Sequence, residues 1–203
     1  MVFEVKENAL QENASKIAEI LQKGGIAVYP TETSYGIGCG ISHRAAVERI
    51  FLLKKRPKSQ PLPVIAADQE MMEEYAVVVS AAEKLVEEFM PGPLTLILGR
   101  KRKVPDWFPG ETIAVRIPGN KTARELCRLA EEPIVSTSAN ISGERQFYEI
   151  KQVLREFGKK VSLIIDAGDL EFNQPSTLYD VEHTRVVRKG KISKEQIEEA
   201  LSR

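Results

Sequence analysis

Cysteine is scarce in this sequence, and its placement excludes two common ways of stabilising a small fold. The 203 residues include two cysteines, Cys39 and Cys127, and neither lies in a CxxC or Cys/His cluster. A disulfide framework and a structural zinc site are therefore both excluded.

Long apolar runs are also missing: no stretch approaches the roughly 18 apolar residues of a membrane span, and the N-terminus lacks the apolar core of a signal peptide. We expect a cytoplasmic protein that does not enter a membrane.

The standard phosphate-binding and nucleophile motifs are missing as well. The sequence contains no GxxxxGK[ST] loop, no GxGxxG after a strand and no GxSxG turn. No cluster of residues at metal-ligand spacing is present either, so we expect no metal ligands from the protein. Basic and acidic residues balance at 29 each, and no bulk field draws the protein to nucleic acid or to a membrane. Any basic site must therefore be local.

What the sequence does contain is typical of one globular domain spanning residues 1–203. Hydrophobic residues make up 42% and charged residues 29% of the chain. Periodicity predicts helices at 8–23, 42–53, 68–75, 80–90, 120–130, 148–157 and from 193, and strands at 26–29, 62–66, 94–98, 112–117, 134–135, 161–166, 176–180 and 184–188. The predicted helix caps are Ser42, Asp68, Ser80 with Glu83, Asn120, and Ser193 with Gln196. Because strands and helices alternate irregularly, we predict an α+β or mixed α/β fold with a twisted mixed sheet and flanking helices.

The stretch from residue 24 to residue 40 is the first candidate for function. Ile26 to Tyr29 reads as a buried strand that Pro30 should end, because proline cannot donate to a strand ladder. The hydroxyl and carboxylate residues of 31–34 follow, and then glycines at 36, 38 and 40. This pattern predicts a loop that presents polar groups to a ligand at a strand end. The alternative is a hairpin turn whose hydroxyls have no function.

Three groups of polar residues could bind an anion. Lys54 and Arg56 lie just beyond a predicted helix, before Pro57, and suit a polyphosphate, although cations there also complement the helix dipole. The segment 136–140, Ser-Thr-Ser-Ala-Asn, follows a predicted strand and can hold phosphate or carboxylate oxygens, or merely form a capped turn. Arg116 alternates with aliphatic residues, so it faces either solvent or a pocket.

Five motifs occur in an order that resembles the YrdC-type threonylcarbamoyl-AMP synthases. They are PTETSYGIG, the Lys54-x-Arg56 pair, PGPLTLIL, TIAVRIP and STSANISG, and the resemblance runs from about residue 10 to Gly190. It implies an α/β twist of a mixed sheet around a concave basic cavity. It also implies that L-threonine, bicarbonate and ATP, with Mg²⁺, become threonylcarbamoyl-AMP and pyrophosphate. A downstream threonylcarbamoyl transferase complex would then use the product to modify tRNA next to the anticodon.

The resemblance assigns roles to individual residues. Lys54 and Arg56 would be catalytic. The residues implied to bind ATP are Lys54, Arg56, Gln60, Thr112, Ser138, Asn140 and Arg188. The residues implied to bind threonine are Thr33, Arg116, Ser136 and either Ser176 or Thr177, of which Thr177 is preferred. Departures from the family pattern are Glu144-Arg145-Gln146 after SANISG, Ile65 where some members have histidine, and no sign of the second domain of the longer family form.

Two other functions remain open on the sequence. One is an RNA-binding module of the same fold, for double-stranded RNA, tRNA or rRNA, without synthase activity. The basic run 100–103 suits phosphate contacts, whereas the neutral net charge and the single tryptophan, Trp107, argue against it. The other is a paralogue that acts on another carbamoyl adenylate. Because no candidate nucleophile has an adjacent base in a known motif, we expect direct attack rather than a covalent intermediate.

Overall fold

The computed structural model describes residues 2–57 and 62–203. Its strands are β1 (Phe3–Lys6), β2 (Ala27–Pro30), β3 (Tyr35–Gly40), β4 (Val64–Ile65), β5 (Leu94–Gly99), β6 (Thr112–Arg116), β7 (Ile134–Ser138), β8 (Leu163–Asp166), β9 (Thr177–Asp180) and β10 (Arg185–Arg188). Its α-helices are α1 (Ala14–Gln22), α2 (Arg44–Leu53), α3 (Gln69–Tyr75), α4 (Ser80–Phe89), α5 (Lys121–Ala130), α6 (Ile150–Phe157) and α7 (Lys194–Ser202). Two short 3₁₀ turns, Glu7–Ala9 and Gln11–Asn13, precede α1.

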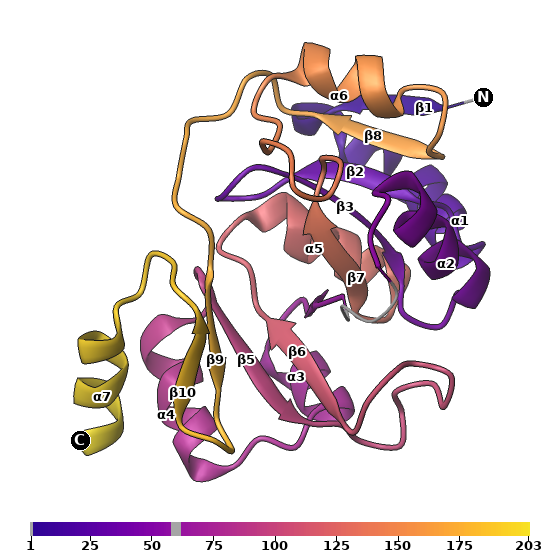
Figure 1. The fold of residues 1–203 in the computed structure, drawn as a ribbon. Helices are drawn as coiled ribbons and strands as arrows, with labels where there is room; N and C mark the ends of the chain where they lie inside the picture. Colours follow the sequence, from indigo (N-terminus) through magenta and orange to yellow (C-terminus); the bar gives the residue numbers. More distant parts are fainter. Residues whose placement is uncertain (1, 58–61) are drawn as a thin grey trace.

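All the strands join one ten-stranded sheet in the order β1-β8-β2-β3-β7-β4-β6-β5-β9-β10. The pairs β1–β8, β2–β8, β4–β6 and β5–β9 are parallel, and the other pairs are antiparallel. Figure 1 shows the two halves of this sheet, with β1, β8, β2, β3 and β7 above and β6, β5, β9 and β10 below. The two-residue strand β4 joins them. The predicted twisted mixed sheet is therefore confirmed.

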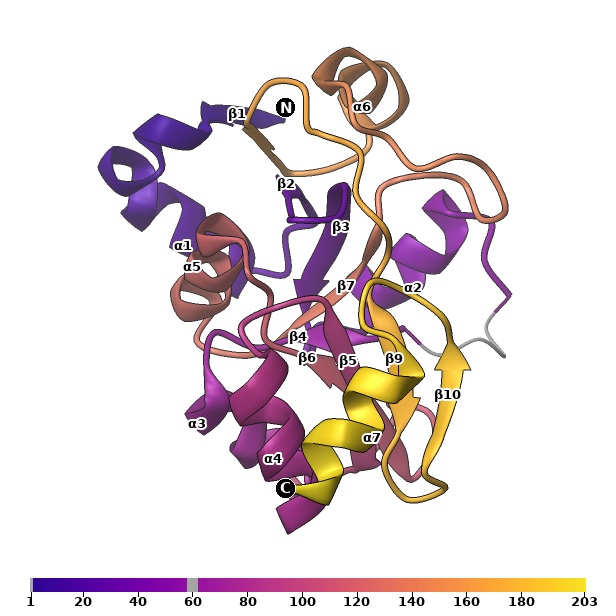
Figure 2. The ribbon, with the colours of Figure 1, turned by 90° about the vertical axis from the view of Figure 1, so that its left-hand side faces the viewer.

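Helices cover both halves of the sheet. α1 and α5 lie side by side (Figure 2) and bury one apolar cluster with β2, β7 and β8. α2 packs against β3, while α4 and α7 pack together beside the β5–β9 half. No helix in the described parts of the chain combines the length and the apolar character needed to cross a bilayer.

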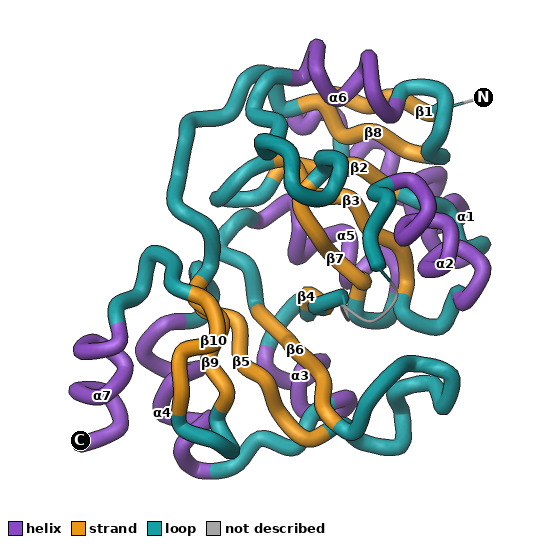
Figure 3. Tube along the Cα trace, viewed as in Figure 1, coloured by secondary structure: helices purple, strands orange, loops and turns teal. Residues whose placement is uncertain are grey.

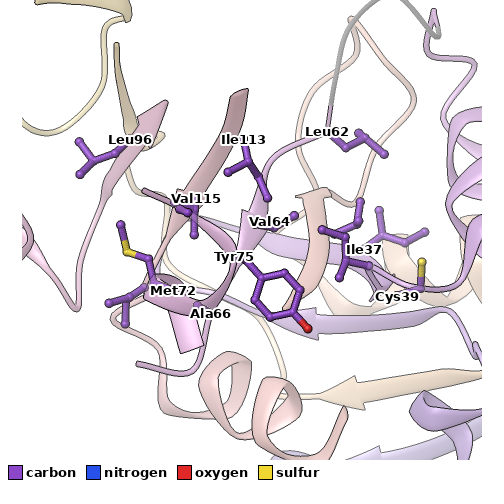
Figure 4. Packing of buried hydrophobic residues seen from close by; sticks show 14 of the residues in the cluster. Ile37, Cys39, Leu62, Val64, Ala66, Met72, Tyr75, Leu96, Ile113 and Val115 are labelled. Carbon is purple, nitrogen blue, oxygen red and sulfur yellow. The ribbon is translucent and has the colours of Figure 1, made fainter. Parts of the chain in front are cut away.

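The larger apolar core runs through the centre of the sheet. Ile37 on β3, Val64 on β4 and Val115 on β6 are completely buried, although these strands come from distant parts of the sequence. Met72 and Tyr75 of α3 pack near them (Figure 4). Each such side chain stabilises the fold by about 1.5–3 kcal/mol relative to an exposed one. This core fixes the central strands, whose ends and connecting turns carry the polar groups described below.

Most helix caps follow the sequence pattern, but two do not. The Asp68 carboxylate accepts from Met71 N, the Asn120 side chain accepts from Ala123 N, and Ser193 forms a full capping box with Gln196. The predictions for Ser42 and Ser80 were wrong. Ser42 N and Oγ instead donate to the Glu132 carboxylate, and α4 begins one residue early so that Ser80 is already helical.

The glycine-rich stretch was also assigned wrongly. Residues 35–40 are not a loop but the buried strand β3, paired with both β2 and β7. A Cβ atom on Gly38 would lie 2.1 Å from Val135 O, so this glycine permits close strand packing rather than ligand approach. Pro30 ends β2 as predicted, and the loop between the two strands comprises residues 31–34 (Figure 3). Strand β1 was not predicted.

Candidate functional site

A pocket lies between the β2–β3 turn and residues of the other half of the sheet. The turn, β4, the ends of β6 and β7, and the segments flanking β9 and β10 all contribute to it. The lining residues are Thr31, Thr33, Ser34, Tyr35, Gly36, Arg56, Pro63, Val64, Ile65, Thr95, Arg116, Pro118, Ser136, Thr137, Ser138, Gln146, Pro175, Ser176 and Arg188. Residues from nine separate parts of the chain thus meet in one cavity.

The charge in this pocket is entirely positive. Arg56, Arg116 and Arg188 line it, and no carboxylate does so in the described parts of the chain. Burial lowers the pKa of Arg188, and the positive charges of Arg116 and Arg56 lower it further. Arginine nevertheless stays protonated at neutral pH. A protein without net charge therefore concentrates three guanidinium groups where an anionic ligand can bind.

The β2–β3 turn supplies a group of hydroxyls. Thr31 Oγ1 donates to Ser34 O at 2.7 Å and accepts from the backbone N–H groups of Thr33 and Ser34, each at 3.2 Å. The Thr31 and Thr33 hydroxyls lie 3.0 Å apart. Thr31 therefore fixes the turn, and Thr33 lines the pocket. The segment is a hairpin turn, but its hydroxyls do face the cavity.

Ser136 on β7 is held from behind by a buried tyrosine. Tyr29 Oη donates to Ser136 Oγ at 2.7 Å, and the Tyr29 side chain has no exposed surface. Burial raises the pKa of Tyr29, so its hydroxyl keeps its proton. Because Tyr29 donates in this hydrogen bond, the hydrogen of the Ser136 hydroxyl is available to a ligand in the pocket.

Lys54 does not lie where its sequence position predicted. Its side chain is 1% exposed rather than projecting beyond α2. Its ammonium donates to Ser138 O, to Asn140 O at 2.8 Å and to Asn140 Oδ1 at 3.2 Å. Burial, reinforced by the charge of Arg56, lowers the pKa of Lys54 to about 8. Of the Lys54-x-Arg56 pair, Arg56 alone lines the pocket.

Ser138 and Asn140 divide their roles in a similar way. Ser138 lines the pocket, whereas Asn140 is buried behind it. Ser138 Oγ donates to Asn140 Oδ1 at 2.6 Å, and Asn140 Nδ2 donates to Glu144 O at 2.7 Å. Asn140 therefore holds the loop that presents Ser138.

At the start of β9, the structure favours Ser176 over Thr177. The buried Thr177 Oγ1 donates to Ile192 O at 2.6 Å and accepts from Ile192 N at 3.0 Å, which leaves it facing away from the cavity. Ser176 lines the pocket, and its hydroxyl accepts from Arg188 Nη2 at 3.0 Å. The structure therefore brings Ser176 and Arg188 to the pocket and does not bring Thr177 there.

One further predicted residue, Thr112, is not brought to the pocket. Thr112 is exposed at the start of β6, four residues from Arg116, which corresponds to about 13 Å along a strand. Gln60 lies outside the described residues. The shared strand face of Thr112 and Arg116 is therefore not sufficient to place both in one site.

Several lining residues were missed in the sequence. Thr95 lies within the PGPLTLIL motif, where its alternation with leucines on a predicted strand could have indicated a pocket-facing side chain. Its hydroxyl lies 2.9 Å from Ser176 Oγ. Gln146 also lines the cavity, although it belongs to the stretch that departs from the family pattern. Ile65 adds an apolar wall.

Among the residues that the structure describes, the site has neither a metal-ligand cluster nor an activated nucleophile. In residues 2–57 and 62–203, no three His, Cys, Asp or Glu side chains group as metal ligands would. Cys39 and Cys127 are buried away from the pocket, and burial raises the pKa of each thiol to about 12. The arrangement can bind and orient anionic groups and stabilise developing negative charge.

Comparison with known proteins shows a consistent set of relatives. The Sua5/YciO/YrdC family model, described as "Telomere recombination", matches residues 19–190. A Methanocaldococcus jannaschii protein, provisionally named a threonylcarbamoyl-AMP synthase, is 34% identical over 190 residues, which is 92% of this chain and 88% of that protein. The Pyrococcus abyssi threonylcarbamoyl-AMP synthase is 35% identical over 206 residues, 99% of this chain and 61% of that protein.

Solved structures show the same fold. The crystal structure of P. abyssi Sua5 complexed with L-threonine superposes with a TM-score of 0.89 at 34% identity, covering 98% of this chain and 60% of that one. Escherichia coli YciO gives a TM-score of 0.86 at 29% identity and is covered over 98% of its length, with 97% of this chain aligned. The chain thus spans about three fifths of the P. abyssi protein and nearly all of the E. coli protein.

Proposed function

Because the chain belongs to the Sua5/YciO/YrdC family, we propose that it is an L-threonylcarbamoyladenylate synthase. The reaction joins L-threonine, bicarbonate and ATP into threonylcarbamoyl-AMP and releases pyrophosphate and water. One observation carries the proposal: three arginines and a group of hydroxyls surround a pocket in which no described carboxylate takes part. Such a pocket suits two anionic substrates and a reaction that transfers charge onto pyrophosphate.

The substrates divide between two sides of the pocket. We assign the nucleotide phosphates to Arg56, Arg188 and Ser138, since guanidinium groups and small hydroxyls bind phosphate oxygens well. We assign threonine to the other side, with its carboxylate on Arg116 and its hydroxyl and amine near Thr33 and Ser136. Lys54, Asn140 and Thr177 support these residues from behind and do not contact substrate in this arrangement.

The reaction proceeds by positioning rather than by covalent catalysis. The amine of threonine, once deprotonated, captures the carbon of bicarbonate to give a carbamate, and water leaves. A carbamate oxygen then attacks the α-phosphorus of ATP, the bond to the bridging oxygen breaks, and pyrophosphate departs. The arginines stabilise the charge that develops on the phosphates, and the hydroxyls hold the reacting groups in line.

Magnesium enters this scheme with the substrate. The described residues form no carboxylate or histidine cluster that would hold a resident ion. Mg²⁺ would arrive bound to ATP, where phosphate oxygens and water complete its coordination. We further propose that the product passes to a cytoplasmic threonylcarbamoyl transferase complex for modification of tRNA next to the anticodon.

The test is incubation with ATP, Mg²⁺, bicarbonate and a labelled amino acid, followed by measurement of pyrophosphate and of the adenylate product. Release should need L-threonine and should fall about a hundredfold or more with L-valine, because a site that hydrogen-bonds a hydroxyl discriminates against the analogue lacking it. Salt-dependent RNA binding without pyrophosphate release would favour the RNA-binding module instead. Adenylate formation with another carbamoyl donor and none with threonine would favour the paralogue.

A further inference from the structure

Glu32 lies beside Arg116, the arginine to which we assign the substrate carboxylate. It belongs to the β2–β3 turn, whereas Arg116 is the last residue of β6, and three strands of the sheet separate β2 from β6. Glu32 Oε1 nevertheless forms an ion pair with Arg116 Nη2. The same oxygen accepts from Gly119 N at 2.9 Å. This side chain therefore connects the hairpin turn to the end of β6 across the sheet.

The burial of the pair shows why the connection matters. Arg116 is 8% exposed, and a buried guanidinium without a counter-charge is strongly destabilising. In the part of the chain that the structure describes, Glu32 is the carboxylate that pairs with it. Arg116 lines the pocket and Glu32 does not, so Arg116 is the member of the pair that a ligand in the cavity contacts.

The contact also leaves the arginine able to bind a ligand. Arg116 Nε and Nη2 are shielded from solvent and make no well-aligned hydrogen bond. The contact with Glu32 is therefore an ion pair and not a bidentate hydrogen-bonded pair. Glu32 Oε2 is likewise unpaired. A guanidinium offers five N–H donors. Nη1 is not among the shielded atoms, so its two N–H groups are the donors that an incoming carboxylate can reach.

From this geometry we infer that Glu32 is a positioning residue for substrate recognition. Its carboxylate keeps Arg116 buried and directed at the pocket, in the orientation that receives the carboxylate of the amino acid. The inference rests on the proposed function, because it takes an α-amino acid as the ligand of Arg116. Glu32 acts through Arg116 and does not contact the substrate.

The test compares ligand binding by the wild type and by Glu32→Gln, which keeps the size and an acceptor for Gly119 N but removes the charge. Titration calorimetry would measure L-threonine, threoninol (which has an alcohol in place of the carboxylate) and a non-hydrolysable ATP analogue. We expect E32Q to weaken L-threonine about tenfold or more, while threoninol and the ATP analogue change by less than about twofold. A defect confined to the ligand that bears a carboxylate is not produced by general loosening of the fold.

Glu132→Gln is the matched control. The Glu132 carboxylate is also largely buried and also accepts from backbone N–H, that of Ser42 at 3.0 Å, but it does not line the pocket. E132Q should bind all three ligands as the wild type does. If E32Q does not fold, Glu32→Asp keeps the charge but withdraws it by one methylene, and the same selective loss is expected.

The possible results distinguish failure of the proposed synthase function from failure of the role of Glu32. A wild type that binds neither threonine nor threoninol overturns both the proposed function and the role of Glu32. A wild type that binds threonine while E32Q binds it equally well or more tightly overturns the role of Glu32 alone. Equal losses for threonine and threoninol overturn it too, since the effect would then not pass through the carboxylate. In an Arg116→Lys background, adding E32Q should cause no comparable further loss.

Discussion

The ammonium of Lys54 donates to both oxygens of Asn140, the main-chain carbonyl at 2.8 Å and the side-chain Oδ1 at 3.2 Å. Its third partner is Ser138 O, so all three hydrogens of the ammonium are engaged by neutral acceptors. The backbone takes part as well, because Ser142 N donates to Lys54 O at 2.8 Å. Lys54 therefore fixes the loop 138–142 and has no hydrogen left for a phosphate in this conformation.

This relationship changes how the Lys54-x-Arg56 pair should be understood. Both residues were expected to bind the phosphates. The structure instead gives Arg56 a place on the pocket wall and gives Lys54 a supporting position behind Ser138. Arg56 can therefore contact a ligand directly, whereas Lys54 holds the loop that carries Ser138.

Replacing Lys54 with methionine should therefore destabilise the protein. Lys54→Met keeps much of the buried stem but removes one donor from each of three acceptors. Ser138 Oγ and Asn140 N still donate to two of them, Asn140 Oδ1 and Ser138 O. Asn140 O loses the donor at 2.8 Å, which carries a desolvation penalty of about 1–3 kcal/mol. We expect a loss of about 2 kcal/mol or more in the free energy of unfolding, measured by urea denaturation. Lys151→Met, at an exposed position in α6, is the control and should change stability by less than about 0.5 kcal/mol. Unchanged stability of K54M would contradict the supporting role.

The same group predicts a pH dependence of stability. Burial lowers the pKa of Lys54 to about 8, while the unfolded value is near the ordinary 10.5. Between these values the unfolded chain binds one more proton at this site than the folded chain does, so the Lys54 contribution to stability rises with pH. The stability of the wild type relative to K54M should accordingly increase between about pH 8 and pH 10.5. Parallel curves for the two proteins over this range would show that the pKa of Lys54 is not depressed.

How far the sequence predicts this site depends on whether the deciding contacts are local. The alternation around Arg116 and the polar turn after Pro30 are local patterns. Arg116 and the hydroxyl residues of that turn do line the pocket. The burial of Lys54 is not local, because its partners lie 84 and 86 residues further along the chain. Strand β1 is likewise defined by its pairing with β8, far along the chain, and its four residues give little periodicity.

Tyr29→Phe should weaken threonine binding with only a modest loss of stability. Removing the hydroxyl deprives Ser136 Oγ of its donor at 2.7 Å and allows the serine to turn its own hydrogen away from the pocket. We expect a stability loss of about 1 kcal/mol and a clear rise in KM for L-threonine with an unchanged KM for ATP. Tyr179→Phe, at another buried tyrosine outside the pocket, serves as the control for steady-state pyrophosphate assays. A rise in both KM values would indicate a general packing defect instead.

The direct-attack mechanism predicts that neither cysteine is needed for activity. Cys39 and Cys127 are buried outside the pocket, and burial raises the pKa of each to about 12, so neither supplies a thiolate at neutral pH. Cys39→Ala and Cys127→Ala should therefore keep their activity per folded molecule, even if the lost sulfur lowers stability.

Direct attack also requires the carbamate to form before ATP is cleaved. Pyrophosphate release should consequently need bicarbonate and threonine together, and omission of either should reduce it to background. The pocket serines have no histidine beside them in the described residues, which leaves no activated nucleophile to hold an adenylyl or carbamoyl group. Intact-mass measurement after incubation with ATP and bicarbonate, but without threonine, should therefore show the unmodified chain. A stable protein–AMP or protein–carbamoyl adduct under these conditions would contradict direct attack and would direct the search to the residue that carries it.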